Sequence, residues 1–197
     1  MKILVTGGGG FLGSAVCRQL AGLGHAVIAY QRSPADHLHD HGVLSRQGSI
    51  TDYPNLLQAS QGCDAVVHTA GKAGIWGKDE DFRAVNVTGT ANAIRACREH
   101  GIRFLVHTSS PSVVHAGGDI EGADESLPLA THFSAPYPET KAEAERLVIK
   151  TSDGELMTTA LRPHLIWGPG DPHILPRLLD KAKGGSLALP APEKIID

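Results

Sequence analysis

The stretch Val5-Thr6-Gly7-Gly8-Gly9-Gly10-Phe11-Leu12-Gly13 decides the fold class of this chain. Within it, Gly7, Gly10 and Gly13 follow a G-x-x-G-x-x-G spacing. The first glycines allow a tight turn and a close approach of backbone N–H groups to a pyrophosphate, and Gly13 lets a helix pack close to the preceding strand. Because the stretch follows a predicted strand and opens a predicted helix, the positive end of the helix dipole faces the turn. The spacing therefore predicts a dinucleotide-binding turn rather than a purely structural one.

Short apolar segments alternate with amphipathic helical segments along the rest of the sequence. The predicted strands are 2–6, 25–30, 43–47, 64–68, 103–108 and 156–161. The predicted helices are 11–23, 53–60, 81–100, 138–151 and 176–183. Strands separated by helices form a parallel sheet, and right-handed crossovers place helices on both of its faces. We therefore predict an α/β protein with a doubly wound parallel sheet, the Rossmann fold.

Prolines punctuate the chain from Pro163 onward, which indicates the exit from a first domain. We predict a dinucleotide-binding Rossmann domain over residues 1–162 and the start of a smaller C-terminal substrate-binding region over residues 163–197. Residues 195–197 read as the middle of a strand. We therefore expect the C-terminal substrate domain to be largely absent from this sequence.

The composition is that of a soluble globular protein, since 41% of the 197 residues are hydrophobic and 20% are charged. A net charge of −3 provides no basic field for nucleic acid or an anionic membrane. The apolar stretches are too short to span a bilayer, and we expect no signal peptide, because the first apolar run is short and lacks a small-residue cleavage site. We expect a cytoplasmic protein that binds neither nucleic acid nor membrane.

Neither the cysteines nor the histidines predict a metal site. Cys17, Cys63 and Cys97 lie far apart in apolar or helical contexts and are expected to be buried, reduced thiols. Histidine and aspartate gather at residues 36–41, but their spacing does not place them on one helix face, and a solvated surface loop is expected there. His68 and His107 end predicted buried strands, and we interpret them as structural groups rather than catalytic bases.

The residues after the second predicted strand bear on the choice of dinucleotide. A NAD-binding protein usually places an acid here to bond the ribose hydroxyl, and this chain has Gln31, Arg32 and Ser33 instead. Arg32 and Ser33 are suited to holding a 2′-phosphate, which an acid would repel. NADP is therefore the preferred cofactor, with NAD as the alternative if Arg32 is only a solvated loop residue.

Tyr137 and Lys141 lie four residues apart at the beginning of the helix predicted over 138–151, and on a helix this spacing places two residues on one face. An ammonium beside a phenol favours the phenolate and lowers the pKa of the tyrosine from about 10. Tyr137 is then usable as an acid or base near neutral pH. A strand ending in Ser109-Ser110 precedes this helix. Together with the glycine turn, these residues predict one half of a hydride-transfer site.

These motifs belong to a series that resembles the extended short-chain dehydrogenase/reductase family, the NAD(P)-dependent epimerase/dehydratase superfamily. The series covers nearly the whole chain in the family's order and consists of residues 6–13, Val67-His68-Thr69-Ala70, Asn86-Val87-Thr88-Gly89-Thr90, His107-Thr108-Ser109-Ser110, Tyr137 to Lys141, Leu161-Arg162-Pro163 and Trp167-Gly168-Pro169-Gly170-Asp171. Residues 68–77 and 109–113 are most similar to the 3β-hydroxysteroid dehydrogenase-like branch, which includes sterol dehydrogenases and bacterial 2-alkyl-3-oxoalkanoate reductases.

The resemblance implies roles by position. Tyr137 would donate or accept the proton, Lys141 would tune it and hold the nicotinamide ribose, and Ser110 would bond the substrate oxygen, with Ser109 and Ser112 as alternatives. Asn86 would support the site. The expected cofactor contacts are Gly7, Gly9, Gly10, Phe11, Leu12, Gly13, Gln31, Arg32, Ser49, Ile50, Thr69, Ala70, Gly71, Lys141 and Pro163. Gln31 and Ser49 depart from the family, because relatives often carry Asp at both positions.

The sequence thus predicts an NADP- or NAD-dependent oxidoreductase that interconverts a secondary alcohol and a ketone, with a β-oxygenated acid or a sterol-like molecule as substrate. One alternative is a nucleotide-sugar epimerase or dehydratase, which uses the same Tyr-Lys chemistry with tightly held NAD. Another is a non-catalytic NADP-sensing protein of the same fold, although such sensors tend to lack the Tyr-Lys pair. The resemblance also implies a homodimer through the long helices that follow Asp81 and Pro138.

Overall fold

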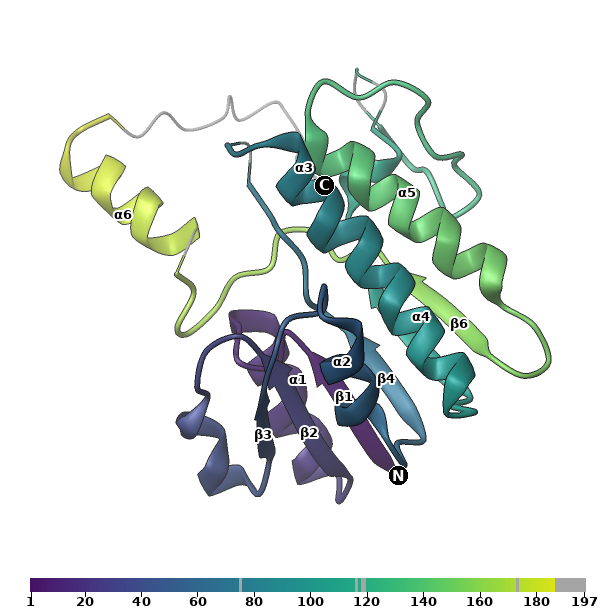
Figure 1. Ribbon diagram of the computed structural model, residues 1–197. Helices are drawn as coiled ribbons and strands as arrows, with labels where there is room; N and C mark the ends of the chain where they lie inside the picture. Colours follow the sequence, from purple (N-terminus) through teal and green to yellow (C-terminus); the bar gives the residue numbers. More distant parts are fainter. Residues whose placement is uncertain (75, 116, 118–119, 173, 187–197) are drawn as a thin grey trace.

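A six-stranded sheet with the strand order β3-β2-β1-β4-β5-β6 forms the centre of the protein (Figure 1). The computed structural model describes residues 1–74, 76–115, 117, 120–172 and 174–186. The strands are β1 (Lys2–Thr6), β2 (Ala26–Gln31), β3 (Leu44–Gln47), β4 (Ala65–His68), β5 (Phe104–Thr108) and β6 (Met157–Leu161). Each neighbouring pair in this order is parallel. The predicted α/β, doubly wound Rossmann fold is confirmed.

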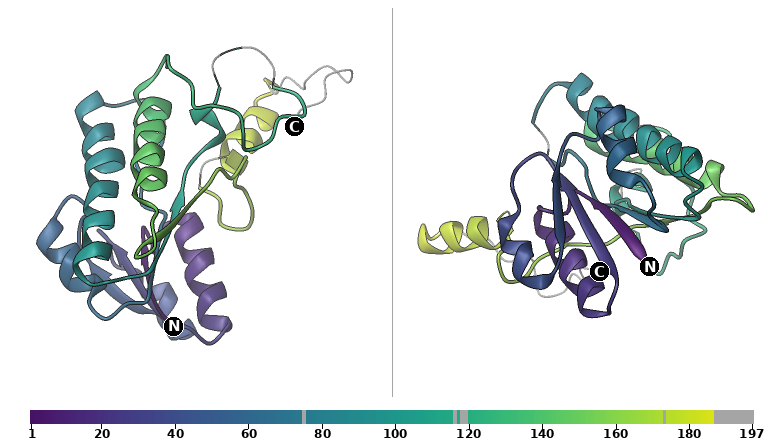
Figure 2. Two further views of the ribbon diagram at one scale, coloured as in Figure 1. Left: turned by 90° about the vertical axis from the view of Figure 1, so that its right-hand side faces the viewer. Right: turned by 60° about the horizontal axis from the view of Figure 1, so that its bottom comes forward.

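Helices lie on both faces of the sheet, with α2, α4 and α5 on one face and α1 on the other (Figure 2). The α-helices are α1 (Phe11–Gly22), α2 (Tyr53–Ser60), α3 (Asp79–Phe82), α4 (Gly89–Glu99), α5 (Pro136–Thr151) and α6 (Ile174–Lys183). Three further turns of helix are η1 (Asp36–His41), η2 (Arg83–Thr88) and η3 (Pro111–Val113). None of the helices in the described part of the chain is long and apolar enough to cross a membrane.

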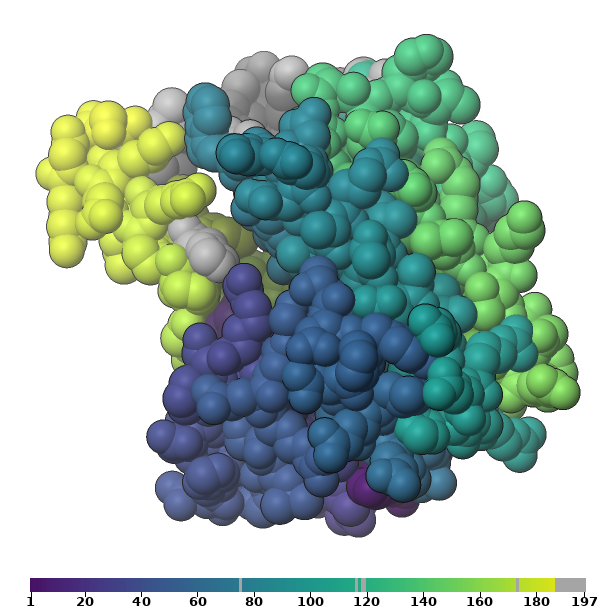
Figure 3. Space-filling view, in the orientation of Figure 1, coloured from purple at the N-terminus to yellow at the C-terminus, as the bar shows by residue number. Residues whose placement is uncertain are grey.

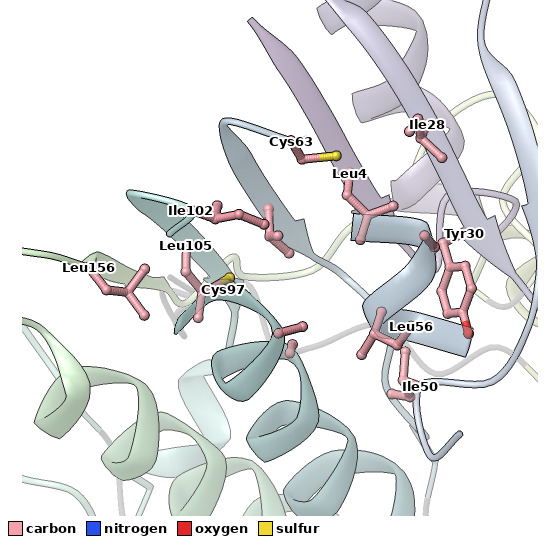
Figure 4. Close-up of a cluster of buried hydrophobic side chains, with 14 residues drawn as sticks. Leu4, Ile28, Tyr30, Ile50, Leu56, Cys63, Cys97, Ile102, Leu105 and Leu156 are labelled. Atoms are coloured by element: carbon pink, nitrogen blue, oxygen red, sulfur yellow. The ribbon is translucent and has the colours of Figure 1, made fainter. Parts of the chain in front are cut away.

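Alternate residues of β1 pack into two separate cores. Leu4 points toward α2 and α4, into a buried cluster that also contains Cys97 (Figure 4). Ile3 and Val5 point to the opposite face, where they pack with Cys17 of α1. Because the middle of the sheet is covered on both faces, its strands are continuously apolar, which is what made them recognisable in the sequence.

All three cysteines are buried and unpaired, as predicted. Burial raises the pKa of the Cys17 and Cys97 thiols to about 12 and also raises the pKa of Cys63. The thiols therefore behave as small apolar groups of the core rather than as nucleophiles.

The prediction of one helix over 81–100 is wrong in its details. The helical segment begins earlier, at Asp79, and passes through the π-helical η2 before continuing as α4. The wider turn contains Asn86, which is buried and accepts a hydrogen bond from the Lys72 backbone in the loop after β4. The next helix, α4, begins at Gly89, where a larger residue would not fit because its Cβ would lie 2.4 Å from the Ile50 side chain. Helical periodicity in the sequence does not distinguish a π turn from an α turn, since the difference is set by these tertiary contacts.

Residues 36–41 form the 3₁₀ helix η1 rather than an irregular loop, because Leu38 is fully buried against the core on the α1 face. The other predicted boundaries agree with the structure to within two residues. The predicted strand at 195–197 lies outside the described residues, as does Ile75 of the motif at 68–77.

Helix α6 lies apart from the sheet and forms a separate lobe (Figure 3). None of its residues is buried. On the sheet face opposite α4 and α5, the edge strand β6 and its neighbour β5 also carry exposed apolar side chains, namely Phe104, Met157 and Leu161.

Candidate active site

The carboxyl ends of four adjacent strands carry a row of polar side chains. The strand register sets Leu4 of β1 beside Val66 of β4, and Val66 beside Leu105 of β5. Two residues further along, the same register aligns Tyr30 with Thr6, Thr6 with His68, and His68 with His107. Ligands of open α/β sheets bind outside the carboxyl ends of the strands. The side chains of these strands thus change from apolar to polar near the carboxyl ends, where a ligand is expected to bind.

The glycine turn has the close packing that a dinucleotide cradle requires. Gly7 has a φ of +71° and donates its N–H to the Tyr30 carbonyl at 2.8 Å. A Cβ on Gly7 would lie 2.8 Å from the Ala70 nitrogen, and one on Gly13 would lie 2.1 Å from the Gly7 carbonyl oxygen. Gly10 precedes the first residue of α1, so the free N–H groups of that helix face the turn. These residues fit the pyrophosphate of a dinucleotide.

A cleft of about 830 Å³ runs along this edge of the sheet. The predicted contacts that it brings together are Gly7, Gly9, Gly10, Gln31, Arg32, Ser49, Ile50, Thr69, Ala70 and Gly71. Predicted residues that do not line it are Phe11, Leu12, Gly13, Ser110, Tyr137, Lys141 and Pro163. The cleft therefore corresponds to the glycine-turn half of the predicted site, and the Ser-Tyr-Lys residues lie beyond it.

The cleft also includes residues that were not among the predicted cofactor contacts. Tyr30 lines it and donates its hydroxyl to the Ser49 carbonyl at 3.0 Å, and a Cβ on Gly48 would lie 2.2 Å from the Tyr30 oxygen. Lys72 lines it with its Nζ 3.5 Å from Asp81. Lys72 directly follows Ala70-Gly71, so its position in the sequence was an available signal for it.

Gln31 lies at the end of β2, and its two side-chain amide atoms differ in their hydrogen bonding. Its Nε2 donates to the Ser45 hydroxyl at 2.8 Å. Its Oε1 is buried without a hydrogen-bond partner among the described residues. Arg32 and Ser33 follow, both exposed and both lining the cleft. An unpaired buried acceptor is costly, so Gln31 is suited to accept a hydrogen bond from a ligand in the cleft.

Helix α5 carries Tyr137 in its first turn and Lys141 one turn later, as their spacing predicts. Tyr137 is half-buried, and its hydroxyl has no hydrogen-bond partner within the described part of the chain. The Lys141 Nζ donates to the Thr108 carbonyl at 2.6 Å and approaches the His107 Nε2 at 3.3 Å. The structure thus joins Lys141 to the end of β5.

Lys141 is only 5% exposed. Burial lowers its pKa to about 8, while the Glu145 carboxylate acts in the opposite direction. Burial, with the nearby Lys141 charge as a smaller cause, lowers the pKa of His68 to about 3 and that of His107 even further. Both imidazoles are therefore neutral at physiological pH, and Lys141 carries the buried positive charge of this group.

The structure separates the two serines at the end of β5. Ser109 is buried and donates its hydroxyl to Glu145, which is also paired with Arg162 at 2.6 Å. Ser110 is half-buried, and its Oγ lies 2.9 Å from the Ser112 Oγ. Ser109 is thus committed to a structural network, whereas Ser110 and Ser112 keep hydroxyls near the edge.

Asn86 links the cleft to α5 through its side-chain amide. Its Oδ1 accepts the Lys72 backbone N–H at 2.8 Å, and its Nδ2 donates to the Thr140 hydroxyl at 3.0 Å. Thr140 immediately precedes Lys141. One buried amide therefore fixes the loop after β4 relative to the helix that carries Tyr137 and Lys141.

No group of three or more His, Cys, Asp or Glu side chains in the described ranges is placed to hold a metal ion. In η1, His37 instead bonds to the Ser14 hydroxyl of α1 at 3.0 Å, so it contributes to the packing beside the glycine turn.

Fold, glycine turn and the Tyr-Lys helix together define a Rossmann-type protein of the extended short-chain dehydrogenase/reductase class. The profile of the 3-beta hydroxysteroid dehydrogenase/isomerase family matches residues 4–194, and the chain belongs to this family.

Curated relatives support the same assignment. The chain is 51% identical to a 2-alkyl-3-oxoalkanoate reductase of Stenotrophomonas maltophilia, over 96% of this chain and 58% of that protein. It is 39% identical to a sterol-4-alpha-carboxylate 3-dehydrogenase, decarboxylating, of Bos taurus, over 94% of this chain and 52% of that protein. The chain thus spans a little more than half the length of these relatives.

Solved structures agree with the fold. MoeE5 in complex with UDP-glucuronic acid and NAD superposes with a TM-score of 0.78 at 30% identity, covering 92% of this chain and 61% of that one. The Bordetella bronchiseptica enzyme WbmH in complex with NAD+ superposes with a TM-score of 0.81 at 22% identity, covering 93% and 63%.

Proposed function

We propose that this protein acts as an NAD(P)-dependent oxidoreductase that interconverts a secondary alcohol and a ketone. The observation that carries the proposal is the pairing of a glycine cradle on β1 with a buried lysine that reaches the end of β5 from α5. The dinucleotide supplies the hydride chemistry when bound, and its glycine cradle, cleft and Gln31 acceptor are suited to it.

The protein's own residues divide the remaining tasks. Tyr137 passes a proton to the carbonyl oxygen during reduction and takes it back during oxidation. The Lys141 ammonium, one helical turn along α5 from Tyr137, supplies a positive charge that assists this proton transfer. Ser110 donates a hydrogen bond to the substrate oxygen as charge develops on it. Ser112 is the alternative donor, because it shares a hydrogen bond with Ser110.

The substrate class that we propose is a 3-oxo or 3-hydroxy compound, either a β-keto acid or a sterol-like molecule. The names of the relatives from Stenotrophomonas maltophilia and Bos taurus support this choice. The experiment is turnover of a panel of β-keto acids and sterols. Turnover of UDP-sugars alone would favour the alternative of a nucleotide-sugar enzyme, to which the likeness to MoeE5 points.

Tyr137→Phe tests the chemistry. This variant removes only the hydroxyl, so we expect turnover to fall by about 100-fold or more with dinucleotide affinity unchanged. Tyr53→Phe is the matched control, because the Tyr53 hydroxyl bonds to Glu99 and Tyr53 does not line the cleft. Turnover that survives in Tyr137→Phe contradicts the assignment of the acid/base.

For the cofactor we propose a preference for NADP. Arg32 and Ser33 at the cleft support it, as does an amide in place of an acid at Gln31. We expect Arg32→Ala to weaken NADPH binding by about tenfold and NADH binding little, because a phosphate contact is a charge-assisted hydrogen bond. Arg103→Ala, outside the cleft, is the control. Equal losses for both dinucleotides, or tighter NADH binding by the unmodified protein, would refute the preference.

We also propose a cytoplasmic homodimer that uses α4 and α5. These two helices lie side by side along one face of the sheet (Figure 1). Sedimentation of the purified protein tests the oligomeric state, and a monomer at micromolar concentration would contradict it.

A further inference from the structure

Two buried imidazoles stack on each other in the sheet, and one of them contacts Lys141. His68 of β4 and His107 of β5 are both fully buried, and their rings stack with centroids 5.3 Å apart. His68 is satisfied at both nitrogens, by the Thr6 hydroxyl at 2.7 Å and the Thr90 hydroxyl at 3.0 Å. His68 is thus held by β1 and α4, as expected for a structural group.

His107 is bonded differently. Its Nε2 lies 3.3 Å from the Lys141 Nζ, and its Nδ1 is buried with no partner among the described residues. An ammonium can only donate, so the His107 Nε2 must accept, and the neutral ring then carries its hydrogen on Nδ1. A buried N–H without a partner costs stability, and packing alone does not account for a polar ring at this position.

We propose that His107 is a positioning residue for Lys141. Its Nε2 and the Thr108 carbonyl each accept one of the three ammonium hydrogens, which fixes the Nζ at the end of β5 and directs the third hydrogen away from the core. The acceptor also favours the charged form of the lysine. This inference rests on the proposed function, because a charged and fixed Lys141 matters there for Tyr137.

The other groups around this ammonium act in known directions. Glu145, on the next turn of α5, favours the charged lysine and also forms an ion pair with Arg162. Tyr137 lies one helical turn before Lys141 on α5. Burial disfavours the charge, and neutral His68 adds none of its own. Among these, His107 is the group whose removal withdraws a hydrogen bond from the Nζ.

The decisive measurement is the pH titration of Lys141 in the dinucleotide-free protein, by NMR of lysine labelled with carbon-13 at Cε. The signal is assigned by its loss in Lys141→Arg. We compare His107→Gln, whose amide reaches the position of Nε2, with His107→Asn and His107→Leu, which do not reach it. We expect a midpoint of about 8 in the unmodified protein and in His107→Gln, and a midpoint lower by about one pH unit in the other two variants.

The same variants change the rate of ketone reduction in a specific way. A midpoint one unit lower leaves about fivefold less charged Lys141 at pH 8, so the alkaline limb of the pH–rate profile moves to lower pH. His68→Gln is the matched control, because it alters the neighbouring imidazole without removing a bond to Lys141. We expect it to lower stability and leave the Lys141 midpoint in place.

Each outcome is decisive. If His107→Asn or His107→Leu, whichever folds, keeps the midpoint of the unmodified protein, the inference is wrong. If His107→Gln shifts as far as these variants, the acceptor at Nε2 is not the cause, and the inference is also wrong. Failure of the proposed function is seen separately, as the absence of dinucleotide-dependent turnover with every ketone and alcohol of the panel, because the Lys141 titration requires neither substrate nor cofactor.

Discussion

Replacing Glu145 by glutamine removes one charge from the most buried ion pair among the described residues. Glu145 is 4% exposed, and its Oε1 accepts from Arg162 through Nη2 at 2.6 Å and Nε at 3.1 Å. The same carboxylate accepts the Ser109 hydroxyl. The network thereby joins the middle of α5 to the ends of β5 and β6, beside Ser110.

The magnitude follows from the burial of the two partners. Breaking a fully buried pair costs about 3–5 kcal/mol, because the remaining charge is left uncompensated. The Arg162 side chain is 22% exposed, so water partly solvates it after the exchange. Glutamine also retains the bond to Ser109. We therefore expect Glu145→Gln to lower the free energy of unfolding by about 2–3 kcal/mol, or Tm by roughly 5–10 °C.

Urea unfolding followed by circular dichroism measures this difference, with Glu143→Gln as the matched control on the same helix. Glu143 pairs with Arg83 at 2.6 Å, but the two side chains are 37% and 51% exposed. Exposed pairs contribute about 0–1 kcal/mol. If the two variants differ by less than about 1 kcal/mol, the reasoning from burial is refuted.

Three further predictions concern the turn, Lys141 and the link to α5. Gly13→Ala places a Cβ 2.1 Å from the Gly7 carbonyl oxygen and should weaken dinucleotide binding by about tenfold or more. Gly22→Ala in the same helix meets nothing within 4 Å and should raise the free energy of unfolding by about 0.5–1 kcal/mol. A dinucleotide titration measures the first effect and urea unfolding the second, and unchanged binding by Gly13→Ala contradicts the first prediction. Burial lowers the pKa of Lys141 from 10.5 to about 8. Between pH 8 and pH 10.5 the lysine is therefore protonated in the unfolded chain but deprotonated in the folded protein, so its contribution to the free energy of unfolding rises with pH across this range. The stability advantage of Lys141→Met over the unmodified protein should therefore shrink by about 3 kcal/mol between pH 7.5 and 10.5, and a difference that does not depend on pH would disprove the shift. Asn86→Ala leaves its buried partners unpaired and should cost about 2–4 kcal/mol in urea unfolding, while a loss below about 1 kcal/mol would show that solvent replaces the amide.

Local patterns in the sequence were sufficient to predict the fold, the glycine turn and the helical spacing of Tyr137 and Lys141. The glycine spacing at residues 7–13, placed between an apolar segment and an amphipathic one, predicts the turn because both its conformation and its close packing depend on glycine. The strand and helix order predicts the parallel sheet, because both faces of such a sheet must be covered. The four-residue spacing of Tyr137 and Lys141 predicts a shared helix face, since helix geometry is local.

Contacts between distant segments decided the rest. Whether Ser109 or Ser110 faces the edge depends on Glu145, 36 residues away. The π turn at Asn86 depends on bonds to Lys72 and Thr140, which lie 14 and 54 residues away.

The environment of Lys141 shows the same division. Its place in the sequence predicted a partnership with Tyr137 along α5, and that spacing is correct. Its hydrogen bonds run instead to Thr108 and His107 on β5, 33 and 34 residues earlier in the chain. Charge and protonation in a buried site are set by the groups within a few ångströms, and only the packing of α5 on the sheet determines which groups those are. The sequence by itself determined that a lysine stands at this position, and the tertiary structure decided what holds its charge there.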